Sequence, residues 1–187
     1  MPPPPPPKRQ PNQAALERQM QWAAFANSEL EAVLTSAASL LAQRQWRLVS
    51  AESCTGGLIA AACTEHAGAS AWFEGGFVCY SASAKIEQLG VSAALLAQRG
   101  MVHEEVARAM AAGALMRSRA QVSVAVTGLA GPDGDDFGQP VGTVCFAWGL
   151  GEASYSETCH FAGSRAAVRG QATLHAMHSL VEYIRLE

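Results

Sequence analysis

The run from Val122 to Val126 (VSVAV) is the feature that most constrains the fold of this chain. Its residues are all small or β-branched, which is typical of a strand buried on both faces. Such a strand needs packing elements above and below its sheet. A glycine-rich loop, residues 127–138, follows directly, so the strand delivers this loop to the edge of the sheet where α/β proteins place their ligand sites.

Helical and extended patterns alternate along the rest of the chain. Steps of three and four residues connect Leu30, Val33, Leu34, Ala37, Leu40 and Leu41, which predicts a helix from Asn27 or Ser28 to about Arg44. Further helices are expected at 58–66, 83–89, 104–117 and 164–184, and a helical turn at 93–98. The other strands are expected at 47–51, 73–81, 141–149 and 154–161. Together they predict an α/β fold, a three-layer α/β/α sandwich with a mixed sheet.

Two parts are expected in the 187 residues. Residues 1–26 form a proline-rich tail and a short lead-in, and six consecutive prolines favour an extended or disordered segment. A short helix over residues 14–25 is one interpretation of the lead-in. Residues 27–187 form the domain.

Composition excludes several classes of function. Charged residues make up 16% and the net charge is −3, which argues against a nucleic-acid partner. No apolar stretch reaches the roughly 20 residues of a membrane helix. The five cysteines have no CxxC spacing and no secretory signal precedes them, so reduced thiols and a cytoplasmic location are expected.

The segment AESCTGG, residues 51–57, joins an expected strand to an expected helix. Glycines permit a tight turn, and the first N–H groups of the helix have no partner within it, so they favour an anion or a developing oxyanion. Ser53 lies at this turn. Its hydroxyl is either a nucleophile or, like that of Thr55, a helix cap. Cys54 is a rival nucleophile because thiol pKa values fall at a helix start, but consecutive side chains of such a turn point apart.

A serine nucleophile needs a base, and Lys85 is the candidate. It closes the segment Tyr80–Lys85, although a lone lysine on a short helix is also typical of a solvated surface. Acting as a base at neutral pH requires a lysine pKa near 7, which costs about 4–5 kcal/mol. His175 and His178 lie three apart on the last helix, but no carboxylate or cysteine stands at ligand spacing, so no metal site is predicted.

Two further segments carry candidate ligand contacts. Thr127 ends the buried strand and Gly128 lets the backbone approach a ligand, although a plain flexible loop fits equally well. The acidic residues of this loop lack the spacing of an EF-hand. Arg165 and Arg169 stand in the first turns of the last helix, where cations oppose the helix dipole. A ligand anion, a neighbouring subunit or solvent exposure of one arginine accounts for them.

Together these segments resemble the C-terminal domain family of CinA, the competence/damage-inducible protein. The matching motifs are AESCTGGLIA (51–60), GxxxYSxxxK from Gly76 to Lys85, VTGLAGPDG (126–134) and PVGTV (140–144). The resemblance covers about residues 27–185. It implies hydrolysis of the carboxamide of nicotinamide mononucleotide to nicotinate mononucleotide and ammonia, without metal or organic cofactor, by a homo-oligomer.

The resemblance also implies roles for particular residues. Ser53 and Lys85 match a Ser–Lys dyad, with Tyr80 and Thr127 assisting. The implied substrate contacts are Glu52, Thr55, Gly56, Gly57, Gly128, Arg165 and Arg169. The oxyanion is expected at the N–H groups of the Gly56-Gly57 helix start.

The chain departs from the family pattern at three places: Ala82-Ser83, Asp133 to Asp136, and Gln139. Two carboxylates in a loop that faces a phosphate are unfavourable for substrate affinity. These departures keep two other interpretations open, a non-catalytic nucleotide- or partner-binding domain and a hydrolase for a different amide.

Overall fold

The computed structural model describes residues 28–135 and 137–187. Within these residues five strands form one sheet in the order β2-β1-β3-β4-β5. The strands are β1 (Leu48–Glu52), β2 (Phe73–Val78), β3 (Val122–Gly128), β4 (Thr143–Leu150) and β5 (Ala153–His160). β1 is parallel to β2 and β3, whereas β4 is antiparallel to both β3 and β5. The predicted mixed sheet is confirmed.

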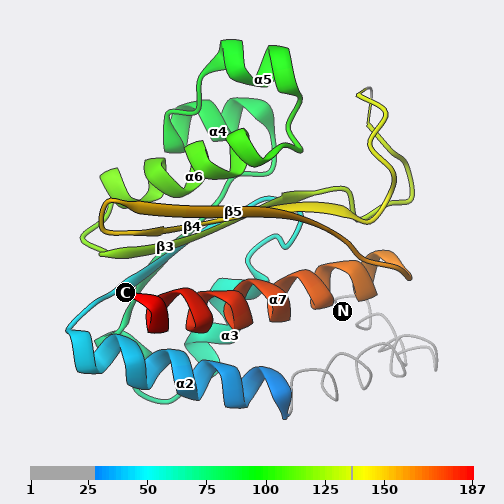
Figure 1. The fold of residues 1–187 in the computed structure, drawn as a ribbon. Helices are drawn as coiled ribbons and strands as arrows, with labels where there is room; N and C mark the ends of the chain where they lie inside the picture. The colour runs from blue at the N-terminus through cyan, green and yellow to red at the C-terminus, as the bar shows by residue number, and fades with distance from the viewer. Residues whose placement is uncertain (1–27, 136) are drawn as a thin grey trace, which may run out of the picture.

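Helices cover both faces of the sheet, as the three-layer prediction requires (Figure 1). One layer contains α2 (Glu29–Arg44), α3 (Leu58–Glu65) and α7 (Arg165–Leu186). The other contains α4 (Ala82–Leu89), α5 (Ala93–Arg99) and α6 (Glu104–Met116). A short 3₁₀ turn, η1 (Ala69–Ala71), precedes β2.

The central strand β3 is buried on both faces. Val122, Val124 and Val126 belong to the core with α2, α3 and α7, whereas Ala125 belongs to the core with α6. This two-sided burial is what the run of small and β-branched residues predicts. Alternation along the strand also decides which side chains reach which helix layer.

Some boundaries differ from those expected. β2 ends at Val78 rather than Ser81, because β1 ends opposite it at Glu52 and because Ser81 caps α4 by accepting the N–H of Ala84. β4 begins at Thr143 rather than residue 141, since Gly142 turns the chain with φ 98°. The expected turn at 93–98 is the helix α5.

The first and last described helices, α2 and α7, differ in how their N-termini are capped. Ser164 caps α7 through the N–H of Ala167, as predicted. Ser28 occupies the N-cap position of α2, but its side chain makes no capping bond. The expected tail, its possible helix and Asn27 lie outside the described residues.

The apolar face of α2 packs within the chain. Leu34 and Leu41 are buried in the core that α2 shares with α7. This face of α2 is therefore covered within the chain, and self-association stays a prediction. Among residues 28–135 and 137–187, no helix has the length and apolarity that crossing a bilayer requires.

Candidate active site

Ser53 follows the last residue of β1 and continues its line. Its N–H donates to the carbonyl of Val126 at 2.9 Å. Because Glu52 pairs with Val126 in the parallel register, Ser53 lies beside Thr127 at the carboxyl ends of neighbouring strands. Ala51 and Ala125 belong to the core of α4–α6, so the alternation of side chains directs Ser53 and Thr127 to that same layer.

Lys85 reaches Ser53 from helix α4. Its Nζ atom lies 2.8 Å from Oγ of Ser53 and donates to the carbonyl of Cys79 at 2.8 Å. The lysine side chain is fully buried and Ser53 is 7% exposed. The alternative of a solvated surface lysine is therefore wrong for Lys85. The structure brings the two residues that the sequence predicted, Ser53 and Lys85, into contact.

Burial changes the acidity of this amine. It lowers the pKa of Lys85 from 10.5 to about 8, because a charged ammonium loses its hydration in the core. Both hydrogen-bond partners of Nζ are uncharged groups, a serine hydroxyl and a backbone carbonyl. A substantial fraction of Lys85 is therefore neutral at mildly alkaline pH, and a neutral amine has a lone pair that can accept a proton.

Glu52 points away from Ser53, to the opposite face of the sheet. Its carboxylate is fully buried and accepts the N–H groups of Gly57, Ile59 and Ala60 at 2.9–3.1 Å, together with the hydroxyl of Ser50 at 3.0 Å. These N–H groups belong to the start of α3. Glu52 thus satisfies the free N–H donors and offsets the dipole of this helix. Its carboxylate faces α3 and not the Ser53–Lys85 pair, so the geometry does not support the expected substrate contact.

The expected oxyanion donors are occupied. The N–H of Gly57 binds Glu52, and the N–H of Gly56 donates to the carbonyl of Ser53 at 3.1 Å. The expectation that these two donors hold an oxyanion is therefore wrong. Within the described residues, the N–H groups of Cys54 and Thr55, the first two after Ser53, donate to no backbone carbonyl in this turn, although both approach the Cys54 sulfur.

Cys54 is a poor rival to Ser53. Its side chain packs in the core of α2, α3 and α7, on the other side of the sheet from Lys85. Burial raises the pKa of its thiol to about 12, so the expected fall at a helix start does not occur. Thr55 is also fully buried, and its hydroxyl has no partner in the described part of the chain.

The two arginines of α7 have different surroundings. Arg169 donates from Nε to the carbonyl of Cys54 at 3.0 Å and from Nη2 to that of Thr55 at 2.8 Å, so it braces the serine turn. Arg165 is exposed and donates to the carbonyl of Gly131 at 2.6 Å and to the Tyr80 hydroxyl at 3.1 Å. Backbone carbonyls, rather than an anion, offset the positive charge of Arg169 at this helix start.

Thr127 and Gly128 have structural constraints of their own. The Thr127 side chain is buried and donates its hydroxyl proton to the carbonyl of Met101 at 2.7 Å. A Cβ atom on Gly128 would come within 2.8 Å of the Thr143 carbonyl and of the Val144 side chain. β3 and β4 therefore approach each other too closely at this point for any larger residue.

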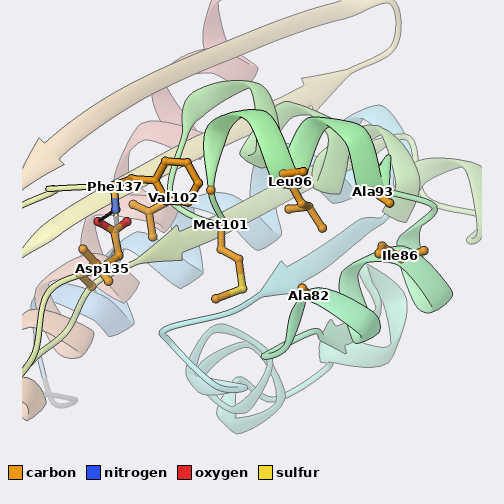
Figure 2. Close-up of a pocket in the computed structure, with 11 residues that line it drawn as sticks. Ala82, Ile86, Ala93, Leu96, Met101, Val102, Asp135 and Phe137 are labelled. Carbon is orange, nitrogen blue, oxygen red and sulfur yellow. Dashed lines mark hydrogen bonds between the residues drawn. The ribbon is translucent and has the colours of Figure 1, made fainter.

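An apolar groove of about 420 Å³ lies beside α4 (Figure 2). Its walls come from α4 and α5, from residues 100–102 and from the loop after β3. Asp135 lines it, but this carboxylate already accepts the N–H groups of Phe137 and Gln139 at 3.0–3.1 Å. The lining suits a flat, uncharged part of a ligand, and the Asp135 charge holds its own loop. Asp136 lies outside the described residues.

Sequence reasoning missed the backbone groups of this centre. The carbonyls of Cys79 and Met101 hold Lys85 and Thr127, and no residue type signals a carbonyl. It also missed the partners of His175, which are Glu157 and Cys159 of β5, because they are near only in space. His178 faces Glu182 of its own helix instead, at 3.7 Å.

Comparison with known proteins matches the part of the chain that contains these residues. The family model described as "CinA C-terminal domain" matches residues 30–184. The protein of Pseudomonas putida named nicotinamide-nucleotide amidohydrolase PncC is 49% identical over 136 residues, which cover 73% of this chain and 85% of the relative. The protein of the same name from Escherichia coli K12 is 46% identical over 156 residues, covering 82% and 94%.

Longer relatives and solved structures belong to the same CinA group of proteins. A CinA-like protein of Mycolicibacterium vanbaalenii is 51% identical over 144 residues, 76% of this chain but 34% of the relative, so this chain spans about a third of that protein. Crystal structures of CinA superfamily proteins match at TM-scores of 0.81 (Escherichia coli, 38% identical, covering 82% of this chain and 90% of the other) and 0.82 (Klebsiella pneumoniae, 37% identical, 84% and 99%).

The role of Glu52 can be tested by Glu52→Gln. We expect this variant to lose about 2–4 kcal/mol of unfolding free energy, because an amide nitrogen would face N–H donors and the buried charge is lost. Urea denaturation measures this quantity. Glu65→Gln, at the exposed end of the same helix, is the matched control and should change little. Equal stability of both variants would contradict the role given to Glu52.

Proposed function

Because this chain belongs to the CinA C-terminal domain family, we propose that it hydrolyses the carboxamide of nicotinamide mononucleotide through a Ser53–Lys85 dyad. The products are nicotinate mononucleotide and ammonia. The observation that carries the proposal is the buried contact of 2.8 Å between Lys85 Nζ and Ser53 Oγ. Relatives named nicotinamide-nucleotide amidohydrolase, 46–49% identical, support the substrate.

The first half of the reaction is acylation. Neutral Lys85 takes the proton of the Ser53 hydroxyl, and Oγ attacks the carboxamide carbon. We assign the oxyanion to the N–H groups of Cys54 and Thr55, since the residue after the nucleophile commonly supplies such a donor. One preorganised donor of this kind is worth roughly 3–4 kcal/mol in the transition state.

The second half returns the enzyme to its starting state. Protonated Lys85 gives its proton to the departing nitrogen, so ammonia leaves and an ester on Ser53 remains. Water then attacks this ester and loses a proton to Lys85, and Lys85 returns that proton to Oγ of Ser53 as the carboxylic acid leaves. Tyr80, exposed at the rim with its hydroxyl bound to Arg165, is the second candidate donor for the leaving nitrogen.

Arg165 is the better candidate for the substrate phosphate. A guanidinium has five N–H donors, and Arg165 uses two nitrogens for Gly131 and Tyr80 while remaining exposed. Arg169 is only partly exposed and points into the serine turn. This leaves Arg165 free to make charge-assisted bonds to a phosphate at the site rim.

A cytoplasmic location and self-association are also part of the proposal. The cysteines at 54, 63, 79, 145 and 159 are free thiols, which suits a reducing compartment. Ile86, Met101 and Phe137 expose apolar surface at the groove, and such surface is typical of interfaces.

The nucleophile is tested by Ser53→Ala. We expect ammonia release from nicotinamide mononucleotide to fall on the order of 10³-fold or more, because the alanine lacks the attacking oxygen. Cys54→Ser is the matched control and should retain most of the activity, since its side chain faces the other core.

The outcomes separate the alternatives. Activity that survives in Ser53→Ala but is lost in Cys54→Ser would assign the nucleophile to the cysteine. No release by the unmodified protein, with nucleotide binding intact, would favour a binding domain or a different amide substrate.

The pH dependence reports the base. The working form is the unprotonated amine, so kcat/KM should rise as pH rises through about 8, the pKa of Lys85, and fall tenfold per unit below it. Ammonia release measured from about pH 6 to about pH 10 gives this profile. Tyr80→Phe should keep the rising limb. A profile that is flat across this range would remove Lys85 as the base.

Phosphate recognition is tested by Arg165→Gln. We expect the KM for nicotinamide mononucleotide to rise about 10–100-fold, because charge-assisted hydrogen bonds are lost. Free nicotinamide, which has no phosphate, should be a poor substrate for both proteins and show no such difference. Arg185→Gln, exposed near the other end of α7, is the control. An unchanged KM in Arg165→Gln would contradict the assignment.

A further inference from the structure

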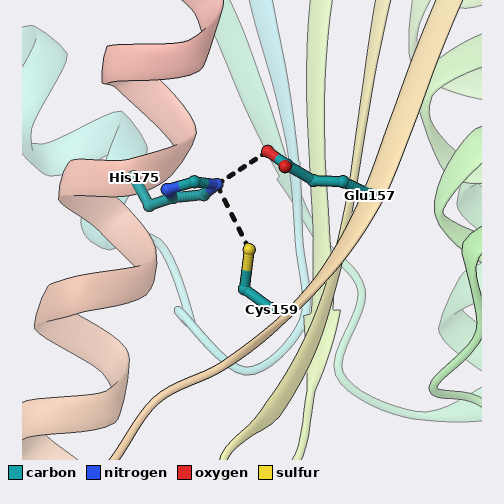
Figure 3. A group of neighbouring side chains, drawn as sticks. All are labelled: Glu157, Cys159 and His175. Carbon is teal, nitrogen blue, oxygen red and sulfur yellow. Dashed lines mark hydrogen bonds and ion pairs between the residues drawn. The ribbon is translucent and has the colours of Figure 1, made fainter.

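Three metal-ligating side chains meet between β5 and α7, outside the active site (Figure 3). The Nε2 atom of His175 lies 2.7 Å from Oε1 of Glu157 and 3.4 Å from Sγ of Cys159. The three candidate ligand atoms all lie within 4.8 Å of one another. Glu157 and Cys159 are two residues apart, so strand alternation directs both to the α7 face of β5.

The imidazole is held in this direction by aromatic neighbours. The ring centroid of His175 is 4.8 Å from that of Phe146 and 5.8 Å from that of Phe161. Ser179, one turn further along α7, donates to Glu157 Oε1 at 3.4 Å. The histidine nitrogen and the carboxylate therefore face each other in a supported geometry rather than on free side chains.

We propose that Glu157, Cys159 and His175 bind a divalent transition-metal cation of the zinc class, which joins the edge strand β5 to helix α7. One nitrogen, one sulfur and one oxygen ligand suit a borderline-soft cation, whereas a thiolate disfavours magnesium and calcium. Such a cation takes four ligands in tetrahedral geometry. The three side chains leave the fourth position to water.

Two of the three ligand–ligand distances come close to those around such an ion, and all three ligand atoms lie within 4.8 Å of one another. With metal–ligand distances of about 2.0–2.3 Å, tetrahedral ligands are separated by roughly 3.3–3.6 Å. The nitrogen–sulfur distance of 3.4 Å already agrees, and the carboxylate must withdraw from Nε2 by roughly 0.6 Å. His175 and Glu157 are 30% and 35% exposed, so an ion can enter from solvent. Binding transfers the Cys159 thiol proton to solvent and forms a metal–sulfur bond.

This site is separate from the proposed reaction. β5 is the edge strand beyond β3 and β4, whereas Ser53 follows β1. Glu157 and Cys159 face α7, and the dyad faces α4 on the other side of the sheet. Loss of the metal site should therefore leave ammonia release unchanged, so the two proposals fail independently.

Cobalt(II) is the probe for the test, added to the chelator-treated full chain. We expect visible bands of a four-coordinate ion together with a thiolate-to-cobalt charge-transfer band, and zinc should abolish both by displacing cobalt. Zinc should also raise the Tm, since a ligand that binds only the folded state stabilises it. Cys159→Ser should remove the charge-transfer band, and Glu157→Gln should weaken the zinc Kd about tenfold or more.

His175→Gln and His178→Gln form a matched pair on one helix. The first should abolish the response to cobalt and zinc, and the second should leave it intact, because His178 faces Glu182 away from the cluster. Absence of the charge-transfer band in the unmodified protein, its survival in Cys159→Ser, or equal losses in the two histidine variants would overturn the proposal.

Discussion

The contact between a buried lysine amine and a serine hydroxyl is the interaction on which the proposed chemistry of this protein depends. Lys85 is fully buried with uncharged partners, and the pKa falls from 10.5 to about 8. At about 1.4 kcal/mol per unit, this shift corresponds to about 3 kcal/mol that the fold imposes on the charged form. Burial is what lowers this pKa.

Consecutive residues at the end of β1 serve opposite faces of the sheet. Ser53 turns to α4 and Lys85, whereas Glu52 turns to α3 and accepts three of its first N–H groups. Glu52 therefore satisfies the first N–H groups of α3. Arg169 of α7, in the same helix layer, binds the carbonyls of the turn after Ser53. The N–H groups of Cys54 and Thr55, which follow Ser53 in this turn, are therefore the donors that we propose for the oxyanion.

The same alternation separates two sites on one sheet. β1 and β3 bring Ser53 and Thr127 to the α4–α6 layer, and β5 brings Glu157 and Cys159 to α7. An edge strand has one free side, and β5 is held on its other side by pairing with β4 along its whole length. A cation bound between β5 and α7 would cross-link the edge strand to this helix, on the other face of the sheet from Ser53 and Lys85.

The sequence by itself determined the element types, because hydrophobic periodicity and small β-branched runs have few interpretations. VSVAV predicted a strand buried on both faces, and the glycines after Ser53 predicted the turn. Motif resemblance brought Ser53 and Lys85 forward as a pair, although spacing alone left each as an ordinary cap or surface residue. Only the tertiary structure decided that Lys85 is buried against Ser53, that Glu52 fills the helix start, and that Cys54 faces away. It also decided that His175 meets Glu157 and Cys159. The physical reason is that each of these contacts joins separate elements across or along the sheet, where register and packing, not local pattern, set the distances.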